Sequence, residues 1–139
     1  MQLRFNPDGK FRIMQIADIQ DTQITSRDKP DLVVFTGDQI KGYGVTLLLG
    51  DREENFKKAF SNFLKPVVDR GIPFTFCFGN HDAQAFGISK ERQFEIYKSF
   101  PGCLAERGDS GLEGLANHNT LIKDSKGGEA GNTRFFGKI

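Results

Sequence analysis

Polar residues that could bind metal ions follow three separate apolar segments of this chain. Residues 79–82 (Gly-Asn-His-Asp) come after the apolar run 73–78, Asp38 comes shortly after the run 32–35, and Asp18 ends the first apolar run. If these runs are parallel strands, their carboxyl ends meet at one edge of a sheet, where open α/β sheets place their sites. One strand-end acidic residue is commonly a turn or a helix cap, but three such endings together favour a metal site.

The residue types at these strand ends suit phosphoester hydrolysis. Two metal ions about 3.5–4 Å apart can lower the pKa of a bridging water and neutralise charge on the phosphoryl oxygens. Asp38 could bridge the ions, Asp18 could bind the first, and the amide oxygen of Asn80 could bind the second. His81 could protonate the leaving group or donate to the phosphate, and Asp82 could orient the His81 ring.

Strands and helices that alternate along the chain are expected to position these side chains, which indicates an α/β fold. We predict strands at 11–17, 32–35 and 73–78. A parallel crossover usually needs a dozen or more residues and contains a helix. The polar link 19–30 has barely that length, so we expect a shortened crossover between the first two strands.

Two helices are predicted downstream of the second strand. The clearer one follows Asp51, where apolar residues recur at helical spacing and predict a face packed in the core. Asp51 can cap this helix together with Glu54, Pro66 should bend or tighten its last turn, and Gly71 should terminate it. A shorter helix is expected to start after Ser89 as its cap and to end near residue 100.

Gly-rich sequence near the end of the chain predicts a β-hairpin. Its arms are expected at 119–123 and 134–139, joined by a loop over 125–132, so that the chain stops inside the second arm. His118 precedes the first arm, and we interpret it as a polar residue of the surface or the hairpin.

The composition is that of one domain without a nucleic-acid or membrane signature. The 139 residues include 19 Lys and Arg and 18 Asp and Glu, and this net charge of +1 gives no electrostatic footprint for nucleic acid. No apolar run approaches the roughly 18 residues of a membrane span, and the first residues do not read as a signal peptide. We therefore expect the chain as given to be soluble. Whether Cys77 and Cys103 form a disulfide stays open at this point.

Three sequence blocks resemble a known family. Residues 16–20 (Ile-Ala-Asp-Ile-Gln), 34–38 (Val-Phe-Thr-Gly-Asp) and 78–82 (Phe-Gly-Asn-His-Asp) look like the first three signature blocks of the calcineurin-like metallophosphoesterase superfamily, and of its purple-acid-phosphatase-like branch in particular. The resemblance implies a β-sandwich with helices on both sides and a dinuclear centre of iron, manganese or zinc. We therefore expect an α/β fold that is the amino-terminal half of the metallophosphoesterase α/β/β/α sandwich, with a mixed sheet, flanking helices and a final strand cut short.

The metal-ligand set that the resemblance implies is incomplete in this chain. The family has a histidine where this chain has Gln20, whose amide oxygen could still bind a metal ion. The family also closes its site with histidines from the second half of the domain, whereas this chain contains only His81 and His118. We therefore expect residues 1–139 to be a single, truncated domain. The expected metal ligands are Asp18, Gln20, Asp38 and Asn80, and the expected catalytic residues are His81 and Asp82.

Two functional hypotheses follow from the resemblance and its gaps. The first is the amino-terminal half of a metal-dependent phosphatase or phosphodiesterase, active only when a downstream half is present in the full gene or in a partner chain. Its substrate would be a small phosphoester or a phosphoprotein. The second is a catalytically incomplete or inactive fragment that serves at most as a binding or interaction module. In the second case, apolar surface left exposed by a missing half would favour self-association.

Overall fold

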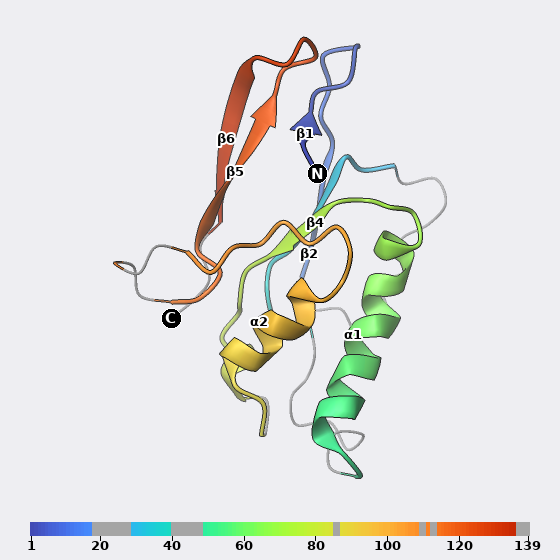
Figure 1. The fold of residues 1–139 in the computed structure, drawn as a ribbon, viewed down its shortest axis with the longest axis vertical. Helices are drawn as coiled ribbons and strands as arrows, with labels where there is room; N and C mark the ends of the chain where they lie inside the picture. Colours follow the sequence, from blue (N-terminus) through green and yellow to red (C-terminus); the bar gives the residue numbers. More distant parts are fainter. Residues whose placement is uncertain (18–28, 40–48, 85–86, 109–110, 112–113, 136–139) are drawn as a thin grey trace.

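The computed structural model describes residues 1–17, 29–39, 49–84, 87–108, 111 and 114–135. These residues form two three-stranded sheets and two α-helices (Figure 1). The sheet β1-β5-β6 lies at the top of that view, and the two helices lie in its lower half. The elements are β1 (Leu3–Arg4), β2 (Ile13–Ile16), β3 (Leu32–Phe35), α1 (Arg52–Val68), β4 (Phe74–Phe76), a 3-10 turn at Asp82–Gln84, α2 (Lys90–Lys98), β5 (His118–Lys123) and β6 (Glu129–Phe135).

The three strands predicted from the apolar runs form one parallel sheet. β3 is central and pairs with β2 and β4, with Ile16 opposite Phe35 and Phe35 opposite Phe76. Because all three strands run in the same direction, their carboxyl ends share one edge, as predicted. The bounds of β3 match the prediction, whereas β2 and β4 are shorter than the predicted strands.

Every residue of β3 is buried because both faces of the parallel sheet are covered. Val33 and Phe35 belong to the core cluster that contains the buried faces of α1 and α2. Leu32 and Val34 pack instead with Leu3 of β1 and with β5. A continuous apolar run is what a parallel strand buried on both faces requires. The described residues thus form a mixed α/β fold with a helical layer and two sheets, consistent with the amino-terminal half of the expected sandwich.

Aromatic side chains join the helices to the parallel sheet. The Tyr97 ring of α2 stacks on Phe76 of β4, with ring centroids 3.8 Å apart, and meets Phe60 of α1 edge-on at 4.3 Å. Phe94 lies 5.7 Å from Phe76, measured between ring centroids. Burying each large side chain of this kind contributes about 1.5–3 kcal/mol, so this cluster fixes the helices on the sheet.

Both predicted helices are confirmed, together with their caps. The Asp51 carboxylate accepts a hydrogen bond from the Glu54 backbone, and the Ser89 hydroxyl accepts one from the Arg92 backbone. Pro66 lies inside α1, near its end, and Gly71 takes a positive φ of 63° in the turn that follows. α2 ends at Lys98, slightly earlier than predicted.

The hairpin exists, but its predicted loop is too long. β6 begins at Glu129 rather than at residue 134, which leaves a turn of residues 124–128. One oxygen of the Asp124 carboxylate accepts hydrogen bonds from the backbone of Lys126 and Gly128, and these bonds tighten the turn. β1, which pairs in parallel with β5, was not predicted from the sequence.

The surface alternative for His118 is wrong, because the residue is 7% exposed, and His118 instead lies in the hairpin as the first residue of β5. His118 Nδ1 lies 2.9 Å from the Ala116 carbonyl oxygen, which can only accept, so Nδ1 carries the proton of the neutral ring. His118 Nε2 then accepts from the Thr75 hydroxyl at 2.7 Å. Since Thr75 is on β4 and His118 is on β5, this buried hydrogen bond joins the two sheets.

Three further expectations are addressed by the described residues. Cys77 and Cys103 are both free thiols, so they form no disulfide with each other. None of the helices in the described ranges is long and apolar enough to cross a membrane. Most of the link 19–30, with the predicted shortened crossover, lies outside the described residues.

Candidate functional site

The carboxyl ends of β3 and β4 meet through glycine backbones. Gly37 follows β3 with a φ of 93°, and a Cβ atom built on it would lie 2.3 Å from the Gly79 nitrogen. A Cβ atom on Gly79 would in turn lie 2.4 Å from Oδ1 of Asp38. Asp38 itself has a φ of 56°, in a region that residues with side chains rarely adopt. Glycine is therefore required at both positions for the two strand ends to come this close.

Two carboxylates hold these strand ends together. Oδ2 of Asp82 accepts hydrogen bonds from the backbone N–H of Asp38, at 3.0 Å, and of Gly79, at 2.6 Å. In return, Oδ1 of Asp38 accepts from the backbone N–H of His81 at 2.8 Å. We call this set of five residues, Gly37, Asp38, Gly79, His81 and Asp82, the strand-end junction. It brings together two of the three predicted strand ends.

Asp82 is the most buried carboxylate of the junction, with 7% of its surface exposed. Burial raises the pKa of the Asp82 carboxyl, the two backbone donors act to lower it, and the nearby Asp38 carboxylate acts to raise it again. The observed contacts of Asp82 are those of a residue that positions the backbone. A role in orienting the His81 ring stays a prediction.

The sequence contains a local signal for the hydrogen bond between the Gly79 backbone and the Asp82 carboxylate. Asp82 lies three residues after Gly79 and reaches back to its backbone N–H. This is the same spacing at which the acidic residue of a capping box reaches back to the start of a helix. A 3-10 turn begins at Asp82 itself, directly after this contact.

Two buried glutamines near the junction were not anticipated. Gln39 is 5% exposed, and its side-chain nitrogen donates to the carbonyl oxygens of Gly37 and Ile16. Gln93 of α2 is 1% exposed and donates to the carbonyl oxygens of Asp82 and Ile88. Each glutamine thus fixes backbone on one side of the junction.

The side chains of Asn80 and His81 are exposed at the same edge of the sheet, and Asp38 is partly buried beside them. The structure therefore brings Asp38, Asn80, His81 and Asp82 together. Asp18 and Gln20, the other two predicted ligands, lie outside the described residues. Within the described part of the chain, no group of three or more His, Cys, Asp or Glu side chains is placed to hold a metal ion.

A model of a known protein family matches most of this chain. The model of the calcineurin-like phosphoesterases matches residues 11–131, a range that begins before β2 and extends into β6. The chain belongs to the calcineurin-like phosphoesterase family. The resemblance of the three sequence blocks is thereby confirmed.

Relatives of this calcineurin-like phosphoesterase chain include plant and yeast proteins. The chain is 27% identical to the probable inactive purple acid phosphatase 14 of Arabidopsis thaliana, over 99% of this chain and 40% of that protein. It is 26% identical to the probable inactive purple acid phosphatase 29 of the same plant, over 87% of this chain and 37% of that protein. It is 30% identical to the phosphatase DCR2 of Saccharomyces cerevisiae, over 74% of this chain and 21% of that protein. The chain thus spans two-fifths or less of these relatives, and no solved structure matches it.

Members of the calcineurin-like phosphoesterase family generally bind divalent metals, and the donors at this edge are of a fitting type. The Asp38 carboxylate and the Asn80 amide supply hard oxygen donors. Gly79 has no side chain that could block access to the Asp38 carboxylate. Oδ2 of Asp82 binds two backbone N–H groups.

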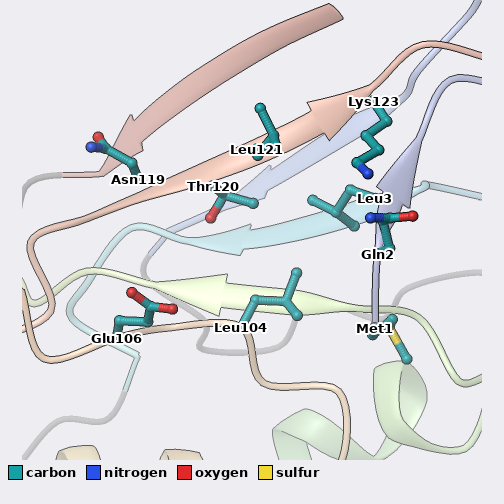
Figure 2. Close-up of a pocket in the computed structure, with 9 residues that line it drawn as sticks. All are labelled: Met1, Gln2, Leu3, Leu104, Glu106, Asn119, Thr120, Leu121 and Lys123. Carbon is teal, nitrogen blue, oxygen red and sulfur yellow. The ribbon is translucent and has the colours of Figure 1, made fainter. Parts of the chain in front are cut away.

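A cavity of roughly 260 Å³ lies elsewhere, beside β1 and β5 (Figure 2). Its lining combines the charged side chains of Glu106 and Lys123 with the apolar side chains of Leu3, Leu104 and Leu121. No residue of the strand-end junction lines it, so the cavity and the candidate metal site of this phosphoesterase chain are separate.

Proposed function

We propose that this chain carries part of the active site of a metal-dependent phosphoester hydrolase. The observation that supports the proposal is the strand-end junction, in which Asp38 and the segment of Asn80 and His81 are held side by side by reciprocal hydrogen bonds. Family membership supports the reaction class.

Under this proposal, Asp38 and Asn80 would hold metal ions together with Asp18 and Gln20. Two bound dications or trications (iron, manganese or zinc) would supply a water of lowered pKa and neutralise phosphoryl charge. His81, exposed at the same edge, would donate a proton to the leaving-group oxygen or to the phosphate. Asp82 would keep the backbone of residues 79–82 in place.

The proposal is tested by hydrolysis of p-nitrophenyl phosphate with added manganese. We expect metal-dependent turnover that His81→Ala lowers by about 10²–10⁴-fold, as is typical when a general acid is lost. Asp124→Asn is the matched control, because it changes an aspartate of the hairpin turn, which belongs to the other sheet. In a protein that contains the complete phosphoesterase domain, turnover that is absent, or that is equal in His81→Ala and the unsubstituted protein, contradicts the proposal.

A second candidate function is metal or ligand binding without catalysis. It is favoured by the names of two relatives, which are called probable inactive phosphatases, and by Gln20 in place of the family's histidine. Calorimetric titration with manganese separates the two candidates. Micromolar binding of two ions with turnover supports the hydrolase, whereas binding without turnover supports the binding module.

The substrate of the proposed hydrolase would be a small phosphoester or a phosphoprotein. Self-association through apolar surface belongs to the second candidate function, and sedimentation velocity would test it. The large apolar side chains that are most exposed in the described residues are Met1, Ile13, Leu49 and Leu121. A monomer at high protein concentration would contradict self-association.

A further inference from the structure

Gln39, the residue after Asp38, joins the exits of two strands through one amide group. Its Nε2 lies 2.6 Å from the Gly37 carbonyl oxygen, after β3, and 3.3 Å from the Ile16 carbonyl oxygen, at the end of β2. Both partners are carbonyl oxygens, which only accept, so the nitrogen of the amide must face them. Asp18 follows Ile16 by two residues, so Gln39 contacts the backbone that leads into one predicted ligand and the backbone next to the other.

The burial of Gln39 is difficult to explain by stability alone. Its side chain is 5% exposed, and Oε1 is buried without a hydrogen-bond partner among the described residues. An unpaired buried acceptor is costly and offsets the gain from the two bonds that the nitrogen makes. The Ile16 carbonyl also accepts from the Thr36 backbone at 2.9 Å, so it does not depend on Gln39 for a partner. An apolar side chain of similar size would fill this position without the orphaned oxygen.

We infer that Gln39 is a positioning residue, which holds the exit of β2 against the backbone that carries Asp38. This inference rests on the proposed function for its consequence, metal binding, but its structural part holds for the protein without metal. Residues that orient metal ligands in this way typically change metal affinity by about 10–100-fold when they are replaced.

The test measures amide hydrogen exchange, residue by residue, in the metal-free chain. Gln39→Met keeps the length of the side chain and removes the donor, and Gln39→Asn shortens the amide so that it cannot span both carbonyls. We expect exchange at the Asp38 and His81 amides, which bond across the junction, to rise about ten-fold in both variants because local opening becomes easier. The Cys77 amide, which bonds to Phe35 inside the same sheet, should keep its rate.

Thr75→Val is the matched control, because it removes a buried hydrogen bond that β4 makes to the other sheet, away from the junction. It should leave the Asp38 and His81 rates unchanged. Unchanged rates in both Gln39 variants overturn the inference. Failure of both variants to fold also overturns it, because Gln39 would then stabilise the fold rather than position one site.

Titration with manganese separates this inference from the proposed function. If the unsubstituted chain binds manganese, Gln39→Met should raise the dissociation constant by at least about ten-fold, and an unchanged constant overturns the inference. If the unsubstituted chain binds no manganese, the proposed function fails, and the exchange rates alone decide whether Gln39 positions the strand exits.

Discussion

The strand-end junction predicts a large and selective loss of stability when Asp82 is truncated. Asp82→Ala leaves the Asp38 and Gly79 backbone donors without their acceptor in a partly buried place. Hydrogen bonds to charged groups contribute about 1.5–3 kcal/mol each, so the two together contribute about 3–6 kcal/mol. The desolvation that raises the Asp82 pKa offsets part of this gain. We therefore expect a net loss of about 2–4 kcal/mol in the free energy of unfolding, or roughly 6–16 °C in melting temperature.

Two further variants show whether the loss comes from these hydrogen bonds. In Asp82→Asn the single amide oxygen can accept both bonds, because one oxygen of the carboxylate accepts both in the structure. Asp82→Asn should therefore lower the free energy of unfolding by no more than half as much as Asp82→Ala does. Asp124→Ala is the matched control, since one oxygen of Asp124 also accepts two backbone N–H bonds but the residue is only partly buried.

The two aspartates differ in the direction of their pKa shifts. The backbone donors of Gly128 and Lys126 lower the pKa of Asp124, whereas burial raises the pKa of Asp82 in spite of its own two donors. Water can replace the Asp124 carboxylate but cannot readily reach the donors around Asp82, so Asp124→Ala should cost much less. The assay is thermal unfolding followed by circular dichroism, with urea unfolding to obtain free energies. The reasoning is refuted if Asp82→Ala melts within about 2 °C of the unsubstituted protein, or no lower than Asp124→Ala.

Three other outcomes follow from the described contacts. Thr75→Val should lower the free energy of unfolding by about 1–3 kcal/mol in urea titrations, because the buried His118 Nε2 loses its hydroxyl donor; an unchanged value would show that the bond between the sheets does not contribute. Burial lowers the pKa of His118 below its usual value, so the unfolded chain binds the proton more readily and stability should fall as pH drops below about 6.5. His118→Gln should flatten that dependence in urea titrations at several pH values, and equal slopes would refute this. Gly79→Ala should weaken manganese binding in calorimetry, because its Cβ would lie 2.4 Å from Asp38 Oδ1, and an unchanged affinity would contradict a metal role for Asp38.

Elements with strong local signals were predictable from the sequence. Asp51 and Ser89 each precede a helical pattern, and each accepts the hydrogen bond that a cap requires. The β3 run is apolar at every position, and its burial on both faces follows directly. In these cases neighbouring residues determine the structure, so no knowledge of distant contacts was needed.

The failures occur where distant segments decide the structure. His118 is polar and follows a Gly-rich segment, which suggests exposure, but Thr75, 43 residues earlier, supplies a buried partner for it. β1 has only two residues, and only its pairing with β5 defines it as a strand. The early start of β6 depends on the Asp124 side chain, which closes a turn that is shorter than the Gly-rich sequence suggested.

For the candidate site, the sequence identified residue types but not their contacts. Asp82 was expected to orient the His81 ring, and the contacts that the structure shows for its carboxylate are with backbone from two strand ends. No sequence pattern indicated that Gln39 and Gln93 are buried, because a single buried glutamine resembles a surface residue until the fold is known. The spacing of Gly79 and Asp82 was the one local signal from which the junction could have been predicted.

In the strand-end junction, the groups that hold the two strand ends together differ from the groups that the proposed reaction would use. Residue 81 contributes its backbone N–H to the junction, which any residue except proline can supply, whereas a proton for the leaving group would need the imidazole. Asn80 is exposed, so its replacement would not disturb the apolar core. Asp82 and the two glycines, in contrast, are needed for the close approach of the strands whether or not a reaction takes place. This chain could therefore keep the same strand-end geometry without the side chains that the proposed reaction would use, which is why its sequence blocks predict the fold more firmly than the activity.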